Sequence, residues 1–230
     1  MSKPPRFFIS PEQVIDQHIT ITGEDVRHIA TVLRMKTGDE LLLCDGKGAE
    51  YSVEIAQVNK SEIKTDVKVR SKREIRHPLI TLGQGLPKSD KMDWIVQKAT
   101  ELGVATIVPL VTERTIMKIR DEEKRISRWQ KICREAAMQS NRPDIPKVDA
   151  IRTFVDFLQT PNDSTERLDR ARRSLVEVSE PGMLLLLPWE EATVSIKNVL
   201  QQTPGITRII VLIGPEGGFS AQEAEKAKEK

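Results

Sequence analysis

The segment that most constrains the fold is an apolar run near the C-terminal end, followed at once by a glycine-rich turn. Residues 209–213 read Ile-Ile-Val-Leu-Ile, which predicts a strand buried on both faces, as in a central parallel strand. Residues 214–219, called the glycine loop below, read Gly-Pro-Glu-Gly-Gly-Phe. Ser220 and Glu223 have capping-box spacing, so a helix should begin at Ala221. The order strand, loop, helix is typical of a ligand site at the carboxyl edge of an open α/β sheet.

The glycine loop does not match the familiar phosphate-binding loops. It lacks the Gly-Lys-Ser/Thr ending of a P-loop, and its glycines do not have the spacing of the dinucleotide fingerprint. Pro215 removes one amide donor and fixes φ, which suits a rigid wall better than an anion-binding nest. On these residues alone, a structural turn and a ligand-binding loop remain equal alternatives.

Length and composition exclude several classes of protein. With 230 residues, 38% of them hydrophobic and 30% charged, the chain can bury one large core or two smaller ones. The longest apolar stretch, 183–187, is too short to span a bilayer, so we expect a cytoplasmic protein. Cys44 and Cys133 lie far apart in the sequence, and the three histidines lack metal-ligand spacing. We therefore expect neither a disulfide nor a metal site.

The net charge of +2 is unevenly distributed along the chain. Between residues 73 and 160, 16 Lys and Arg stand against 12 Asp and Glu. This excess fits a solvated helix face, and the alternative is a surface that contacts phosphates. Residues 139–142 read Gln-Ser-Asn-Arg, which collects the amide, hydroxyl and guanidinium groups that read base edges and phosphates.

The first 72 residues predict a small β-rich domain with one helix. A helical spacing of apolar residues runs from Gly23 to Met35. Strands are expected at 18–22, 40–44, 49–58 and 61–70. Such a short unit most simply closes as a small barrel of the OB or PUA kind, a shape often used on nucleic acid.

Two groups of side chains in this domain are candidates for contact with nucleic acid. Arg6 precedes two phenylalanines, a combination that can stack on bases but more often fixes an N-terminal strand. Arg27, His28 and Arg34 belong to the expected helix, where Arg27 and Arg34 would share a face. That face is a candidate RNA contact.

Residues 73–78 are polar, end in Pro and predict a linker to a second domain. Beyond the linker, strands alternate with helices, which implies a doubly wound parallel sheet. The expected strands are 79–86, 105–111, 183–187 and 208–213. The expected helices are 90–102, capped by Ser89, then 121–140, 192–202 and the one from Ala221. Residues 154–158 are apolar enough to be buried, and 160–174 predict an exposed loop or helix.

Motifs in both predicted domains together resemble one family. They are 88–93 (Lys-Ser-Asp-Lys-Met-Asp), 97–104 (Gln-Lys-Ala-Thr-Glu-Leu-Gly-Val), Pro109-Leu110, 112–114 (Thr-Glu-Arg), 135–140 (Glu-Ala-Ala-Met-Gln-Ser) with Arg142, 214–220, and in the first domain 6–8 (Arg-Phe-Phe), His28, 32–34 (Val-Leu-Arg), Gly38-Asp39 and Asp45-Gly46. In this order and spacing they resemble the bacterial 16S ribosomal RNA uridine-N3 methyltransferases, the RsmE type of the SPOUT class. The resemblance extends over nearly the whole chain.

The resemblance implies a particular domain organisation. We expect a PUA-like, OB-like RNA-binding β-barrel at 1–72, a linker at 73–78 and a SPOUT methyltransferase domain at 79–230 with a C-terminal trefoil knot. In the family, a short strand, a loop with a functional arginine and a last helix follow the helix in which this sequence ends. We therefore expect the methyltransferase domain to be incomplete at its C-terminal end, and a protein that ends at Lys230 to bind the donor weakly and not to methylate.

The resemblance also implies the ligands. S-adenosylmethionine is the expected methyl donor, and the expected partners are 16S ribosomal RNA in the small subunit and a second copy of the chain. The expected donor-binding residues are Leu187, Gly214, Pro215, Glu216, Gly217, Gly218 and Phe219. The expected RNA-binding residues are Arg6, Arg27, His28, Arg34, Lys88, Arg114, Gln139 and Arg142. Arg114 and Arg142 are candidates for orienting the RNA or its developing charge, and no residue is assigned as the general base.

Two other classes of function stay open on the sequence. A non-catalytic RNA-binding factor for ribosome assembly would share the basic middle region and the small barrel, and it would lack affinity for S-adenosylmethionine. A nucleotide-dependent α/β enzyme would share the strand, glycine loop and helix, and it would bind ATP or NAD. The sequence lacks a phosphate-binding Lys and a downstream ribose-binding acid in the right context, which argues against the second class.

Overall fold

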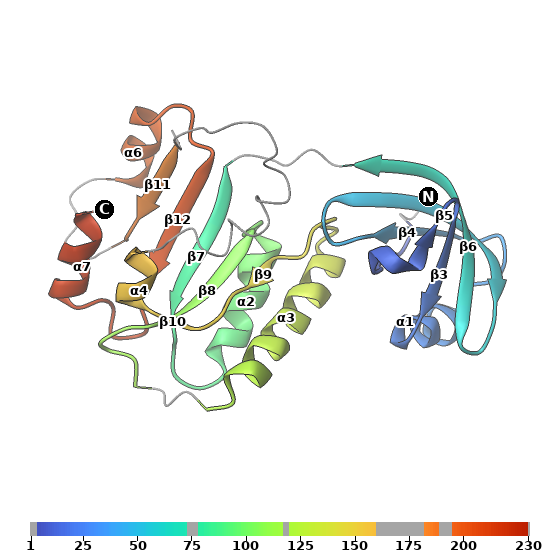
Figure 1. Ribbon diagram of the computed structural model, residues 1–230, viewed down its shortest axis with the longest axis horizontal. Helices are drawn as coiled ribbons and strands as arrows, with labels where there is room; N and C mark the ends of the chain where they lie inside the picture. Colours follow the sequence, from blue (N-terminus) through green and yellow to red (C-terminus); the bar gives the residue numbers. More distant parts are fainter. Residues whose placement is uncertain (1–3, 73–77, 117–119, 160–181, 189–194, 230) are drawn as a thin grey trace. The chain divides into compact units, whose positions relative to one another are not determined.

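The computed structural model describes residues 4–72, 78–116, 120–159, 182–188 and 195–229 (Figure 1). The chain forms two compact units: one comprises residues 1–75 and 134–145, and the other comprises 76–133 and 146–230. Each unit is built on its own six-stranded sheet. Within the described ranges, every helix is too short or too polar to cross a membrane.

The first unit contains a curled sheet in the order β1-β4-β5-β6-β3-β2 (Figure 1). Its strands are β1 (Arg6–Phe8), β2 (Val14–Ile15), β3 (His18–Thr22), β4 (Glu40–Cys44), β5 (Ala49–Val58) and β6 (Glu62–Lys72), with a 3-10 turn η1 at Pro11–Gln13. Buried Tyr51, Val53 and Ile55 alternate with less buried residues along β5, as a strand with one face on a core requires. Two register shifts between β5 and β6 add local twist, which helps the sheet to curl. The expectation of a PUA-like N-terminal domain is confirmed.

The helical region of this unit is shorter than the sequence predicts. It consists of α1 (Glu24–Arg27) and a π-helical turn, η2 (His28–Val32). Arg34 lies beyond both and has φ +55°, in the left-handed region. The prediction that Arg27 and Arg34 share one helix face is therefore wrong, because the chain leaves helical geometry between them.

Residues 134–145 belong to the first unit although they come late in the sequence. Arg134 donates hydrogen bonds to the Phe8 carbonyl at 2.7 Å and to the Asp25 carboxylate at 3.0 Å. Ala137 and Ile145 also join an apolar cluster with Phe8. These contacts connect residues more than 100 positions apart in the sequence, so no local pattern could predict them. The domain boundaries at residues 72 and 79 stay a prediction.

The second unit contains a parallel sheet in the order β10-β8-β7-β12-β11, with β9 beside β8. The strands are β7 (Leu79–Gly85), β8 (Thr106–Val111), β9 (Lys147–Val148), β10 (Arg152–Thr153), β11 (Met183–Leu186) and β12 (Arg208–Ile213). β12 pairs with β7 on one side and β11 on the other, so the prediction of an interior parallel strand is confirmed. The mixed α/β fold with a parallel sheet is likewise confirmed, and the trefoil knot stays a prediction.

The helices of the second unit are α2 (Lys91–Glu101), α3 (Glu122–Gln139), which extends into the residues of the first unit, α4 (Phe154–Gln159), α6 (Ile196–Gln202) and α7 (Ala221–Lys228). The predicted cap of α7 is confirmed: Ser220 Oγ accepts from the Glu223 amide at 3.2 Å, and Glu223 accepts from the Ser220 amide at 2.9 Å. The predicted Ser89 cap of α2 is wrong. Ser89 has φ +58° and α2 begins at Lys91, because the chain turns before entering the helix. Two predictions lie outside the described ranges. They are the exposed loop or helix at 160–174 and the first residues of the helix expected at 192–202.

Candidate donor loop and nucleic-acid surface

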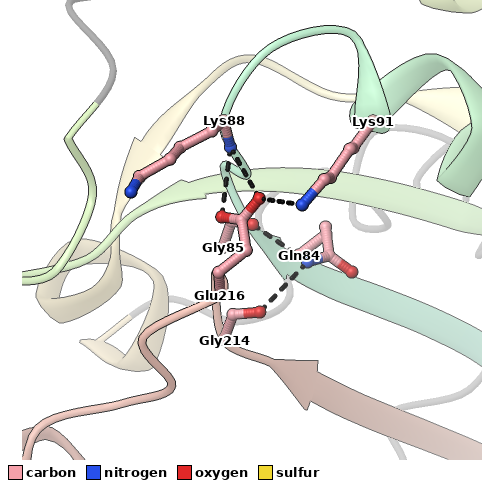
Figure 2. A network of polar contacts seen from close by, with 6 residues as sticks. All are labelled: Gln84, Gly85, Lys88, Lys91, Gly214 and Glu216. Carbon is pink, nitrogen blue, oxygen red and sulfur yellow. Dashed lines mark hydrogen bonds and ion pairs between the residues drawn. The ribbon is translucent and has the colours of Figure 1, made fainter.

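The glycine loop follows β12 at the carboxyl edge of the parallel sheet, beside the end of β7. A Cβ placed on Gly85, the last residue of β7, would lie 2.6 Å from Pro215 Cδ and 2.7 Å from Pro215 N. Only glycine therefore lets the loop approach this strand so closely. The buried Gln84 side chain donates to the Gly85 carbonyl at 2.9 Å and to the Gly214 carbonyl at 3.4 Å (Figure 2). The start of the loop is thus fixed to β7.

Glu216 joins the loop to the turn between β7 and α2. Its two carboxylate oxygens accept from the Lys88 amide at 3.2 and 3.1 Å, and one of them also accepts from Lys91 Nζ at 2.7 Å (Figure 2). The hydrogen bond from Lys91, with those from the Glu216 and Lys88 amides, lowers the pKa of Glu216 to about 2. Glu216 is therefore a carboxylate at neutral pH. The Lys88 side chain is exposed and points away from Glu216 (Figure 2).

Two residues connect the loop to the end of β8. The Arg114 guanidinium donates to the Gly217 carbonyl. Glu223, although buried, accepts from the Glu113 amide at 2.9 Å as well as from the Ser220 amide at 2.9 Å. The glycine loop and the start of α7 are therefore fixed to the chain that follows β8. From the sequence, Glu223 was expected only as a helix cap, because its second partner is 110 residues away.

The loop turns back on itself and leaves only its middle exposed. The Gly218 amide donates to the Pro215 carbonyl at 2.8 Å, and Gly218 has φ +68°. The Phe219 ring lies in the core, 5.0 Å from the Phe154 ring, so its side chain has a structural role. Leu187, just after β11, is half-buried and packs against the same core. The exposed part of the loop is the backbone around Glu216 and Gly217.

Two of the RNA-binding candidates are engaged inside the first unit. The Arg6 side chain is only 9% exposed, with Nη1 2.8 Å from the Glu50 carboxylate and 3.1 Å from Cys44 Sγ. The Arg142 side chain is 12% exposed and pairs with Asp144. These placements favour structural roles, which the sequence left open for Arg6.

The other candidates of this unit are exposed. Arg27, His28, Arg34 and Gln139 all have exposed side chains. The His28 and Phe7 rings form a T-shaped pair with a centroid distance of 5.5 Å. Val32 and Leu33, at the end of the same helical region, are 66% and 40% exposed. In the second unit, Lys88 and Arg114 are exposed as well.

Comparison with known proteins gives the class of this fold and site. Residues 75–230 match the family model described as an RNA methyltransferase domain, and residues 21–68 match an RNA methyltransferase PUA domain. The sheet with its glycine loop and the curled β domain thus correspond to the two parts of an RNA methyltransferase.

Individual relatives narrow the class to one family. The chain is 32% identical to the ribosomal RNA small subunit methyltransferase E of Bacillus subtilis, over 98% of this chain and 85% of that protein. It is 30% identical to the protein of the same name from Synechocystis, over 96% and 67%. A solved structure of the Neisseria gonorrhoeae enzyme bound to S-adenosylmethionine has 27% identity and a TM-score of 0.76, covering 99% of this chain and 86% of that one. The chain belongs to the ribosomal RNA small subunit methyltransferase E family.

Proposed function

We propose that this chain transfers a methyl group from S-adenosylmethionine to N3 of one uridine in 16S ribosomal RNA of the small subunit. The observation that carries the proposal is the glycine loop, whose exposed backbone is fixed from two neighbouring strands at the carboxyl edge of a parallel sheet. The family to which the chain belongs and the donor-bound structure of a relative support the same reaction.

The residues of the loop fit a donor that is held through backbone groups. Gly217 is exposed, although its carbonyl accepts from Arg114, and an added Cβ there would meet the Arg114 side chain at 3.4 Å. Leu187 and the loop residues Gly214 to Phe219 would hold the donor. Phe219 would act through its backbone because its ring is in the core, and Glu216 because its carboxylate accepts from Lys88 and Lys91. Bound there, S-adenosylmethionine would supply a methyl group already activated by its sulfonium. The protein would then have to align that methyl with the acceptor and exclude water.

The acceptor side of the proposal uses exposed Arg, Lys and His side chains. N3 of a paired uracil is buried in the helix, so the base must leave its pair and lose the N3 proton as the bond forms. We propose Arg27, His28, Arg34 and Lys88 as RNA contacts because their side chains are exposed. Arg114 donates to Gly217 through Nη1, and its guanidinium has further N–H groups that an RNA phosphate or a developing negative charge could accept from. A homodimer and a cytoplasmic location complete the proposal by analogy with the family.

The test combines donor binding with product analysis. The full-length protein is titrated with S-adenosylmethionine in a calorimeter and then incubated with small ribosomal subunits that lack the modification. Nucleosides from the purified RNA are analysed by mass spectrometry. Donor binding together with N3-methyluridine would support the proposal. RNA binding without donor affinity would contradict it and favour the non-catalytic assembly factor.

A further inference from the structure

The contacts of Glu216 point to a role that differs from donor binding. We propose that Glu216 is a positioning residue that fixes the middle of the glycine loop to the turn before α2, and that Lys91 acts on the loop through Glu216. The inference rests on the proposed function, because it takes the ligand of the loop to be the methyl donor. It assigns a part in donor binding to Lys91, a residue of α2 outside the loop.

The geometry directs the Glu216 carboxylate toward the turn between β7 and α2. Glu216 accepts from the Lys88 amide through both oxygens and from Lys91 Nζ through one. The single Lys88 N–H is shared between the two oxygens, so two protein donors, one of them a charged ammonium, hold the carboxylate. Figure 2 shows the Glu216 side chain turned toward Lys88 and Lys91. Both partners come from the chain after β7, more than 120 residues from Glu216 in the sequence.

The position of Glu216 in the loop explains why its contacts matter. Gln84 and Gly85 fix the start of the loop, at Gly214 and Pro215. The exposed Gly217 and the half-buried Gly218 follow Glu216, and glycines sample many backbone conformations unless something holds them. If only a fraction of molecules has the loop in its binding conformation, the apparent donor affinity falls by that fraction. Glu216 immediately precedes these glycines and therefore limits their freedom.

The Lys91 contact gives a way to separate positioning from direct binding. The Lys91 side chain is 62% exposed and its described polar contact is with Glu216, so its influence on the loop should pass through that carboxylate. An exposed ion pair is worth about 1 kcal/mol or less, which limits the effect of losing Lys91 to about fivefold in affinity. Loss of the carboxylate charge also weakens the bifurcated bond from the Lys88 amide, so its effect should be larger.

The experiment is a double-mutant cycle on donor affinity, measured by calorimetry with S-adenosylmethionine. We expect Glu216→Gln to raise Kd about tenfold and Lys91→Met to raise it about threefold. The double variant should bind S-adenosylmethionine no more weakly than Glu216→Gln alone, because Lys91 acts only through its ion pair with the Glu216 carboxylate. The control is Glu101→Gln, which removes a similar exposed Glu–Lys pair within α2 (2.8 Å to Lys98) and should leave Kd within about twofold of the wild type.

A second measurement reports on the loop without donor. Amide hydrogen exchange at Gly217 and Gly218 should become faster in both single variants and stay unchanged in the control. Unchanged exchange in Glu216→Gln would overturn the inference. So would weak donor binding in Glu216→Gln with wild-type binding in Lys91→Met, because Glu216 would then contact the donor itself. Failure of the proposed function is distinct: the wild-type protein would then show no donor affinity.

Discussion

The glycine loop and the cationic residues of the first unit differ in what carries their candidate chemistry. In the loop the exposed groups are backbone groups, and the side chains nearby serve to fix them, as Glu216 and Arg114 do. In the first unit the candidates are side chains, and they divide into two kinds. Arg6 is paired internally, whereas Arg34 is exposed at the end of a helical turn.

The difference shows why the two kinds of site are not equally visible in a sequence. A backbone site needs glycine where the chain must approach closely, so it leaves a mark in the sequence itself. A side-chain site uses the same arginines that form internal ion pairs, and the residue type does not reveal the partner. Mutations that separate packing from binding can test this contrast in both units.

The largest effect is expected for Gly85→Val. The added Cβ would lie 2.6 Å from Pro215 Cδ and 2.7 Å from Pro215 N, and backbone cannot move away as a flexible side chain can. We expect a loss of about 1 to 3 kcal/mol in the free energy of unfolding and no measurable donor binding. Urea denaturation and calorimetry provide the two measurements.

Gly217→Val is the matched comparison for Gly85→Val. An added Cβ at Gly217 meets only the Arg114 side chain, at 3.4 Å and beyond, so the free energy of unfolding should stay near that of the wild type. Donor binding should nevertheless be lost, because the side chain would cover the exposed backbone. Equal destabilisation by both substitutions would show that the loop is a packing element and not a binding one.

The second largest effect is expected for Arg6→Ala, on stability rather than on RNA. Glu50, whose side chain is only 19% exposed beside Arg6, would lose that partner. Leaving a mostly buried polar group without its partner costs about 2 kcal/mol, which a shift in the urea midpoint would reveal. Wild-type stability together with weaker RNA binding would instead make Arg6 an RNA contact, as the family resemblance implies.

The local features of the fold were predictable because each depends on neighbouring residues. The apolar run of β12 and the capping box of α7 are local patterns, and both were predicted correctly. The glycine loop was also located, since its glycines follow the strand directly. The Ser89 cap failed because a Ser before a helix has the right composition whether or not the chain turns away, and here φ is +58°.

The contacts that fix the loop were not predictable, because they join distant parts of the chain. Gly85 could have been noticed as a glycine inside a strand, a sign of close backbone approach, but the sequence does not reveal its partner, Pro215. Lys91 was assigned no role from the sequence and Arg114 was expected to contact RNA, and only the parallel sheet brings both to the loop. Arg134, similarly, reaches Phe8 and Asp25 only in three dimensions.

A smaller effect is expected for Arg34→Ala, the exposed counterpart of Arg6. Its side chain has no structural partner among the contacts of the described residues, so the melting temperature should not change. Binding to small ribosomal subunits should weaken severalfold, and the slope of log K against log salt should fall by about 1, because one phosphate contact is lost. The control is Lys197→Ala, which removes an exposed cation from α6. If Lys197→Ala weakens RNA binding equally, the effect of Arg34→Ala reflects a general loss of positive charge and not a lost contact at Arg34.

The smallest effect concerns the titration of Glu216. Its pKa is lowered from 4.5 to about 2, with the Lys91 hydrogen bond as the largest cause. A lowered pKa in the folded state means that the carboxylate stabilises the fixed loop fully above pH 4.5, and that this contribution is lost as the pH falls through about 2. Lys91→Met should therefore raise the pKa of Glu216 toward 4.5. The stabilisation of the loop by the carboxylate would then be lost at a higher pH than in the wild type. Carbon-13 NMR of the Glu216 carboxyl group in the two proteins measures the shift directly. An unchanged titration in Lys91→Met would mean that the Lys88 and Glu216 amides alone lower the pKa, and that the loop is fixed by backbone contacts without help from α2.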